Sequence, residues 1–165
     1  DERLAAEVGR LMVVRTDVAA RLENAGLSLK SRRYACRSLL QGIQTTFHPT
    51  DHGDDQTPVE MLRGLLREEA TGEVLSREEL AEAWRTIFEL ERDRQHFPLA
   101  EDALFHTLTL TPDPGDVLRA GIQFYERLLR LPDDVLERRG LPREEVRAGL
   151  VELEDRREDA STADS

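Results

Sequence analysis

The sequence predicts an all-α protein, an irregular bundle of about six or seven helices with antiparallel helix hairpins. Apolar residues recur at spacings of three and four along most of the 165 residues, which is the period of a helix with one buried face. Aromatic residues make up only 5% of the chain, so we expect a core of Leu, Val, Ile and Ala. Capping residues, Pro and Gly separate the periodic stretches, as they do between helices.

Two helices are expected before Pro49. The first ends at Gly26, which suits the left-handed position after a helix. The second covers residues 28–47. The apolar stripe of the first consists of Leu4, Val8, Leu11, Val18 and Leu22, and that of the second of Leu29, Cys36, Leu40, Ile43 and Phe47.

Two more helices follow, the second of which carries the only tryptophan. Thr57 and Ser76 each begin an S/T-x-x-E capping box, in which a hydroxyl and a carboxylate bond backbone amides of the first turn. The link over residues 73–75 is short, so the two helices are expected to pack as an antiparallel hairpin. Pro98 is expected to end the second helix, because a proline disfavours the helical conformation in the residue before it. The stripe of this helix consists of Leu80, Ala83, Trp84, Ile87 and Phe88.

The last third of the chain predicts further short helices. Residues 99–110 are expected to begin as a helix and fade into a loop, since the alternating HTLTLT stretch has no second strand to pair with. A helix is expected over residues 117–131, where Gly121 in the apolar stripe predicts the close approach of a neighbouring helix. The segments LPDDVLERRGL and LPREEVRAGL each place acids in a first turn and indicate two more helix starts.

We expect one helical domain over residues 1–157, because a chain of this length has the size of a single domain. The tail of residues 158–165, EDASTADS, is acidic, small and polar. Such a terminal segment is expected to be disordered unless a partner orders it.

The charge of the chain is unevenly distributed. The formal net charge of −11 disfavours nucleic acid and anionic membranes as main ligands. Residues 27–50 nevertheless carry +4 and no acidic side chain, so the other 141 residues carry −15. Lys30, Arg33 and Arg37 recur at i, i+3 and i+7 and therefore share a helix face. The four basic residues are Lys30, Arg32, Arg33 and Arg37.

This basic helix is a candidate binding site for phosphate, a nucleic-acid backbone or an acidic partner protein. The alternative is that neighbouring acidic helices neutralise it within one subunit, which is the more common use of such a face.

The loop HPTDHGDDQT is a second candidate site. His48 and His52 lie four residues apart with Asp51 between them, and imidazole and carboxylate are metal ligands. The spacing fits neither a calcium loop nor an H-E-x-x-H helix. A solvated turn has the same composition for local reasons, so the metal site remains an alternative.

The sequence favours binding over catalysis. It holds no P-loop, dinucleotide-binding turn, nucleophile elbow or C-x-x-C pair, which weighs against an enzyme and implies no cofactor. The leading hypothesis is a non-catalytic helical interaction protein, that is, an adaptor, assembly subunit or regulator that binds another protein or itself. The alternatives are metal binding through the histidine loop and anion binding through the basic helix.

We expect a cytoplasmic protein. The only cysteine, Cys36, forms no disulfide within the chain and favours a reducing compartment. No apolar run reaches the eighteen or so residues that a membrane span needs, and no secretory signal pattern is present.

Overall fold

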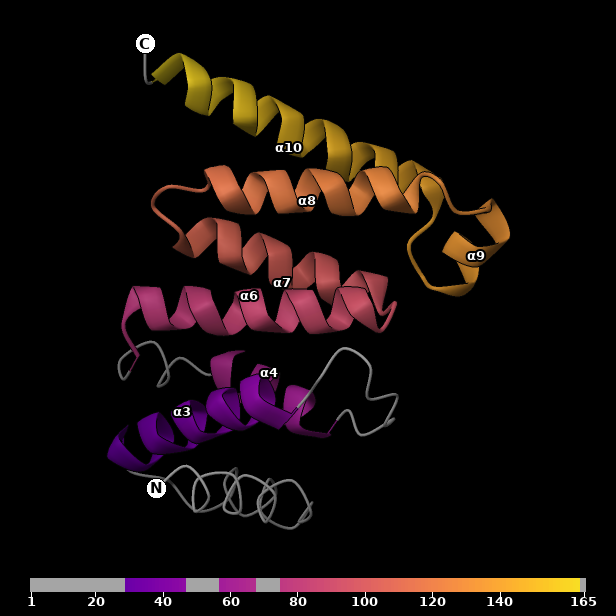
Figure 1. Ribbon diagram of the computed structural model, residues 1–165. Coiled ribbons are helices and arrows are strands. Elements are labelled where there is room, and N and C mark those ends of the chain that lie inside the picture. Colours follow the sequence, from indigo (N-terminus) through magenta and orange to yellow (C-terminus); the bar gives the residue numbers. More distant parts are fainter. Residues whose placement is uncertain (1–28, 47–56, 68–74, 164–165) are drawn as a thin grey trace. The chain divides into compact units, whose positions relative to one another are not determined.

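The computed structural model describes residues 29–46, 57–67 and 75–163, with side chains for residues 33–44, 59–67 and 75–163. Within these ranges it contains seven helices and no strand, which confirms the predicted all-α class. They are α3 (Leu29–Thr46), α4 (Thr57–Arg67), α6 (Arg77–Asp93), α7 (Phe97–Leu110), α8 (Gly115–Leu128), α9 (Asp133–Arg138) and α10 (Arg143–Ala163) (Figure 1). The helix predicted over the apolar stripe that ends at Gly26 lies outside the described residues.

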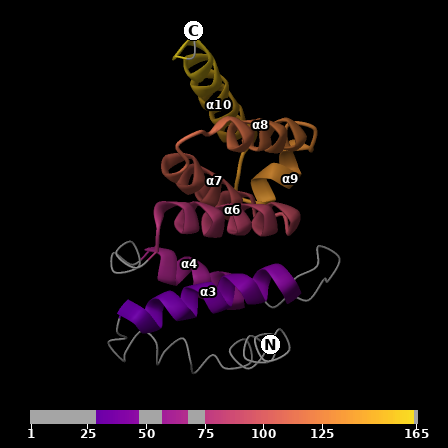
Figure 2. The same cartoon turned by 60° about the vertical axis from the view of Figure 1, so that its left-hand side comes forward.

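The contacts divide the chain into two compact units, residues 1–86 and 87–165, and helix α6 crosses the boundary. In the first unit α3 packs against α4. In the second, α8 packs against both α7 and α10 and lies between them in both views (Figures 1 and 2). Helices α7 and α8 are antiparallel neighbours (Figure 1). The single domain over residues 1–157 stays a prediction.

Helix α6 starts with the capping box that the sequence predicts. The Ser76 amide donates to Glu79 Oε2 at 2.9 Å, and the Glu79 amide donates to Ser76 Oγ at 3.1 Å. Two backbone amides that have no helical carbonyl as acceptor are therefore hydrogen-bonded to side-chain oxygens. The predicted apolar stripe is buried at Ala83, Trp84, Ile87 and Phe88.

The predicted end of this helix at Pro98 is wrong. Helix α6 ends at Asp93 in a Schellman motif, because the His96 amide donates to the Glu91 carbonyl at 2.9 Å and the Gln95 amide to the Arg92 carbonyl at 3.0 Å. Pro98 lies instead in the first turn of α7. A proline is tolerated there because first-turn amides have no helical acceptor.

Gln95 carries backbone strain at this turn. Its φ of 61° lies in the left-handed region, and among the described residues it is the non-glycine position with positive φ. Helix α9 ends in the same hydrogen-bonding pattern, with Gly140 at the equivalent position and a φ of 78°. Glycine adopts this conformation without the clash that a Cβ atom causes.

We therefore expect Gln95→Gly to stabilise the protein by about 0.5 to 1 kcal/mol. The matched control is Gln123→Gly, at an exposed position within α8, which should cost about the same amount. Urea unfolding followed by circular dichroism measures both changes. Destabilisation by Gln95→Gly would contradict the strain argument.

Helix α7 continues through the stretch where a loop was expected, as far as Leu110. The Thr107 side chain is buried, and its hydroxyl donates to the Ala103 carbonyl at 2.8 Å. The exposed Thr109 hydroxyl makes the same bond to the Phe105 carbonyl at 2.9 Å. Threonines bonded to the preceding turn fit a helix, so the alternating pattern does not break it.

The second unit has an aromatic core. Phe124 of α8 meets Phe88 edge to face, with ring centroids 5.6 Å apart, and Phe97 at 6.2 Å. Two glycines then let helices approach. A Cβ atom on Gly121 would lie 2.5 Å from Leu153 Cδ1, and one on Gly149 would lie 2.7 Å from Tyr125 Cε1. The close approach predicted at Gly121 is confirmed.

Helices α9 and α10 begin at the two predicted Leu-Pro segments. Helix α10 then continues to Ala163, six residues into the tail for which disorder was predicted. Its last buried residue is Leu153, and its end projects away from α8 (Figure 2). Extension of a helix whose first half is already packed costs little, which accounts for the extra turns.

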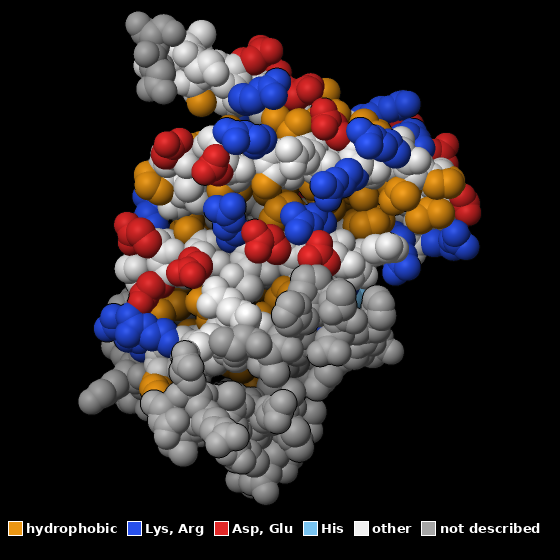
Figure 3. Space-filling model, viewed as in Figure 1, with side chains coloured by type: hydrophobic (Ala, Val, Ile, Leu, Met, Phe, Trp, Pro, Cys, Tyr) orange, Lys and Arg blue, Asp and Glu red, His pale blue; other side chains and the backbone are white. Residues whose placement is uncertain are grey.

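The exposed faces of the second unit carry mixed charge. Acidic and basic side chains alternate over α8 and α10 (Figure 3), and Arg156 of α10 pairs with Glu152 at 2.6 Å. Exposed pairs of this kind contribute at most a few tenths of a kcal/mol. None of the described helices has the length and apolarity needed to cross a membrane.

Candidate functional site

A groove of about 200 Å³ lies between α3 and the first turns of α6. Its floor is apolar and comes from three helices and from Leu75, two residues before α6. Its rim is polar, with amides, a guanidinium and two carboxylates. The floor consists of Cys36, Leu40, Leu62, Leu75 and Ala83, and the rim of Arg37, Gln41, Gln44, Glu79 and Glu82.

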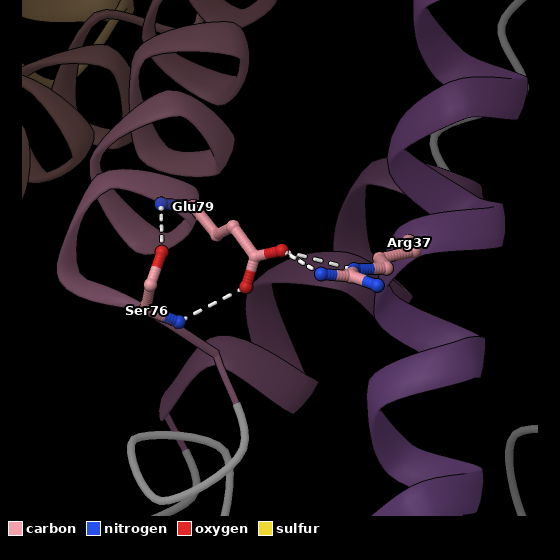
Figure 4. Close-up of polar contacts among 3 residues, drawn as sticks. All are labelled: Arg37, Ser76 and Glu79. Carbon is pink, nitrogen blue, oxygen red and sulfur yellow. Dashed lines mark hydrogen bonds and ion pairs between the residues drawn. The ribbon is translucent and has the colours of Figure 1, made fainter.

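One ion pair bridges the groove (Figure 4). Arg37 Nε of α3 donates to Glu79 Oε1 at 3.0 Å, and Nη2 contacts the same oxygen. The second oxygen, Oε2, accepts the Ser76 amide of the capping box. The Arg37 hydrogen bond, and then the Ser76 amide, hold the pKa of the Glu79 carboxyl below its usual range. Glu79 is therefore a charged link between α3 and the start of α6.

The far end of the rim is held more loosely. Gln44 Nε2 lies 3.4 Å from both Glu82 Oε1 and Thr86 Oγ1. These distances exceed the usual range for an N–H···O bond, and all three side chains lie at or near the surface. Replacing such bonds by bonds to a ligand costs little.

The second unit holds a partly buried polar pair. The Tyr125 hydroxyl donates to Glu101 Oε1 at 2.5 Å, and the tyrosine is fully buried. Burial, and then the Glu101 hydrogen bond, raise the pKa of the Tyr125 phenol well above 10.0, so it stays a donor. Burial also raises the pKa of Glu101 above 4.5. The Tyr125 hydrogen bond lowers this pKa, and the nearby acids Glu145, Glu152 and Asp102 raise it by smaller amounts.

A raised carboxyl pKa means that folding is least favourable when Glu101 is charged. The folded chain keeps this proton at a pH where the unfolded chain has lost it. Stability from Glu101 is thus complete below about pH 4.5 and falls as the pH rises through the folded-state pKa.

We expect Glu101→Gln to unfold at a temperature a few degrees higher than the unmodified protein at pH 7. The difference should shrink as the pH falls toward 4.5, because both side chains are then neutral. Thermal unfolding at a series of pH values measures this. The control is Glu126→Gln on the exposed face of α8, where no such trend is expected. A less stable Glu101→Gln variant at pH 7 would show that the charged carboxylate is the better acceptor for Tyr125.

Comparison with models of known protein families assigns the chain to a family. The model of a family of unknown function, DUF6483, matches residues 65–158, which is more than half of the chain. The chain belongs to this family. No curated protein and no solved structure matches it.

The matched DUF6483 region contains only part of the groove. It includes α6, with Glu79 and Glu82, and both residues of the Tyr125–Glu101 pair. Helix α3, which supplies the opposite wall with Arg37, precedes it. The groove thus joins the family region to the segment in front of it.

The four basic residues of the predicted site differ in where they lie in the structure. The side chains of Lys30 and Arg32 lie outside the described residues. Arg37 is on the groove rim and is paired with Glu79. Arg33 is exposed, and its charge contributes to the lowered pKa of Glu79. Part of the basic strip is therefore neutralised within the chain, as the alternative interpretation expects, and anion binding stays a prediction.

The predicted metal loop with His48, Asp51 and His52 lies outside the described residues. In the described part of the chain, no three His, Cys, Asp or Glu side chains gather in a way that suits a metal ion. His96 has a carboxylate partner that the sequence did not indicate. Its Nδ1 lies 2.8 Å from Glu91 Oε2, and the Glu91 side chain is fully buried.

Sequence reasoning missed most of the groove. Gln41, Gln44 and Glu82 belong to no motif, and Arg37 and Glu79 are 42 residues apart. One signal was present in the sequence. The residues of α3 at positions 34, 37, 41 and 44 repeat at spacings of three and four beside the apolar stripe, so they share an exposed face.

Proposed function

We propose that this protein is a non-catalytic interaction protein whose groove between α3 and α6 receives an apolar anchor side chain of a protein partner. The groove itself, with an apolar floor inside a polar rim, is the observation that carries the proposal. Energetically dominant interface residues typically fill such pockets at the centre of a contact, while polar groups around them exclude water.

The size of the groove favours a side chain over a small-molecule ligand. Pockets for drug-sized ligands and cofactors typically measure about 300 to 1,000 Å³, whereas this one measures about 200 Å³. One or two large apolar side chains fill such a volume. A helix that lays its apolar anchors between two other helices is a common mode of peptide recognition.

The chemistry of the rim also supports binding over catalysis. Glu79 has a lowered pKa and is bonded to Arg37 and Ser76. A catalytic base works best with a pKa near the operating pH, so this carboxylate is a weak base. Cys36 on the floor is buried and forms no disulfide, which supports action in a reducing compartment such as the cytoplasm.

The first experiment tests whether the groove accepts apolar groups. Cys36 is the only cysteine and is buried, so Leu40, which lines the groove and is half-buried, is replaced by Cys in a Cys36→Ala variant. Thiol-bearing fragments are then tethered there as disulfides and counted by mass spectrometry. We expect isobutyl and benzyl fragments to be captured in preference to hydroxyl-bearing fragments of equal size. Equal capture of both kinds would contradict the proposal.

The second experiment tests whether the groove binds a protein. The purified chain, Leu40→Arg and the control Gln123→Arg are each used to retain proteins from the cell extract of the source. Leu40 lies in the groove and is half-buried, whereas Gln123 is exposed on α8. We expect a partner whose retention falls about tenfold for Leu40→Arg only. Equal retention by all three would show that the groove is not the interface, and circular dichroism checks that each variant is folded.

A further inference from the structure

We propose that the apolar anchor of the partner protein enters the groove with a lysine or arginine one helical turn away, and that this cation pairs with Glu82. The inference rests on the proposed function, because it names the chemistry of the partner that the same groove receives. It starts from the charges around the rim.

The rim of the groove has one carboxylate whose charge is not balanced. Arg37 and Glu79 form an ion pair across the groove, so their charges cancel. Glu82 also lies on the rim and is exposed, and it makes no ion pair with the residues that the structure describes. The remaining rim residues, Gln41 and Gln44, are neutral. With one guanidinium and two carboxylates, the rim therefore has a net charge of −1.

A partner that covers the groove removes water from Glu82. Among the described residues, the carboxylate accepts one long hydrogen bond from the neutral Gln44 amide, at 3.4 Å. A charged group that loses its water without gaining a strong donor is costly to bury. A lysine or arginine of the partner offsets this cost, because charge-assisted hydrogen bonds are shorter and stronger than neutral ones. An occupant that is apolar throughout would bind less tightly.

Arg37 does not select an acidic partner in the same way. Its Nε and Nη2 both contact Glu79 Oε1. An incoming carboxylate would have to share these donors with Glu79 or displace it, and two carboxylates at one guanidinium repel each other. Glu82 has no such competitor among the described residues. The rim therefore favours a cation over an anion.

The length of the groove fits a helical partner. Arg37 bonds the α6 wall at one end of the rim, and Gln44 bonds it at the other. These two residues are seven positions apart on α3, so they lie about 10 Å apart along the helix axis. Leu40, on the floor, lies roughly midway between them. A partner helix that lies along α3 with its anchor over Leu40 therefore reaches Glu82 from a position three or four residues away.

Disulfide tethering at Leu40→Cys, in the full chain with Cys36→Ala, measures this preference. The probes are three benzyl thiols of nearly equal size that carry an aminomethyl, a hydroxymethyl or a carboxylate group. They compete for the protein thiol, and capture is expressed relative to capture by glutathione, which corrects for the reactivity of each probe. We expect the aminomethyl probe to be captured about fivefold more than the hydroxymethyl probe, and the carboxylate probe less than either. High salt should reduce the preference, because it screens the rim charges.

Glu82→Gln assigns the preference to one carboxylate. It should remove the advantage of the aminomethyl probe and leave capture of the hydroxymethyl probe unchanged. The matched control is Glu89→Gln, which removes the same charge from an exposed position of α6. Glu89 is two turns further along the helix, about 10 Å away, and is not among the described residues that line the groove. This control should keep the full preference, whereas a simple effect of net charge would appear equally in both variants.

The same position tests a partner protein recovered from the cell extract. Where retention depends on Leu40, it should fall about tenfold for Glu82→Lys, because the new lysine repels the cation of the partner. Glu89→Lys should retain the partner normally. Circular dichroism checks that both variants are folded.

Three results would overturn the inference. They are equal or lower capture of the aminomethyl probe than of the hydroxymethyl probe, an advantage that Glu82→Gln leaves unchanged, and a Leu40-dependent partner that Glu82→Lys still retains. If isobutyl and benzyl fragments are nevertheless captured in preference to hydroxyl-bearing fragments of equal size, the proposed function stands with a neutral or acidic partner. If that preference is also absent, both proposals are wrong.

Discussion

Gly149→Ala is expected to lower the free energy of unfolding by about 2 kcal/mol. The new Cβ atom would overlap the Cζ and hydroxyl of Tyr125 and lie 2.7 Å from its Cε1. The ring cannot move aside easily, because Tyr125 is fully buried and its hydroxyl is bonded to Glu101. This overpacking outweighs the gain of about 1 kcal/mol that Ala normally brings over Gly within a helix. Urea unfolding followed by circular dichroism measures the change.

Gly64→Ala is the matched control. Gly64 lies in the middle of helix α4, and no atom lies within 4 Å of the Cβ that the substitution adds. Only the helix propensity changes, so we expect a gain of about 0.5 to 1 kcal/mol. Similar stabilities for the two variants would show that helix α10 has room to shift away from α8.

Arg143→Met is expected to cost about 2 kcal/mol. Arg143 Nη1 donates to the Leu129 carbonyl at 2.9 Å, Nη2 donates to the Leu131 carbonyl at 2.6 Å, and Nε pairs with Asp133. These carbonyls follow the end of α8, where no helical amide reaches them. The variant keeps most of the apolar stem but loses the bonds that hold α8, α9 and α10 together.

Arg138→Met, in the same region, separates this effect from the loss of a surface charge. Arg138 pairs with Asp134 at 3.1 Å, but both side chains are more than 70% exposed. Exposed pairs one helical turn apart contribute only about 0.3 to 0.5 kcal/mol. Thermal unfolding of both variants should give a clearly larger decrease for Arg143→Met, and equal decreases would mean that water replaces the guanidinium at the two carbonyls.

The sequence predicted the architecture because helical periodicity and capping are local properties. Ser76 and Glu79 are three residues apart and form the expected box, and Gly121 in an apolar stripe marks a close helix contact. The end of α6 was misplaced because Pro98 served as the signal for it. The chain uses Gln95 in the left-handed conformation instead. Glutamine rarely adopts this conformation, so its presence in a sequence does not predict the end of a helix.

The candidate site was largely hidden from sequence reasoning. The basic strip containing Arg33 and Arg37 stood out because charges can be counted along a chain. Its ion-pair partner, Glu79, was interpreted only as a capping residue. A groove depends on which helix faces leave a gap, and such a gap arises from the packing of residues far apart in the sequence. Leu62 and Ala83 therefore looked like ordinary core positions.

The two oxygens of Glu79 have separate tasks. Oε2 secures the beginning of α6 through Ser76, while Oε1 holds α3 through Arg37. An incoming acidic group that competes for Arg37 would release only the second contact. Loss of the Arg37 contact would therefore leave the start of α6 capped, because the carboxylate stays bonded to the Ser76 amide.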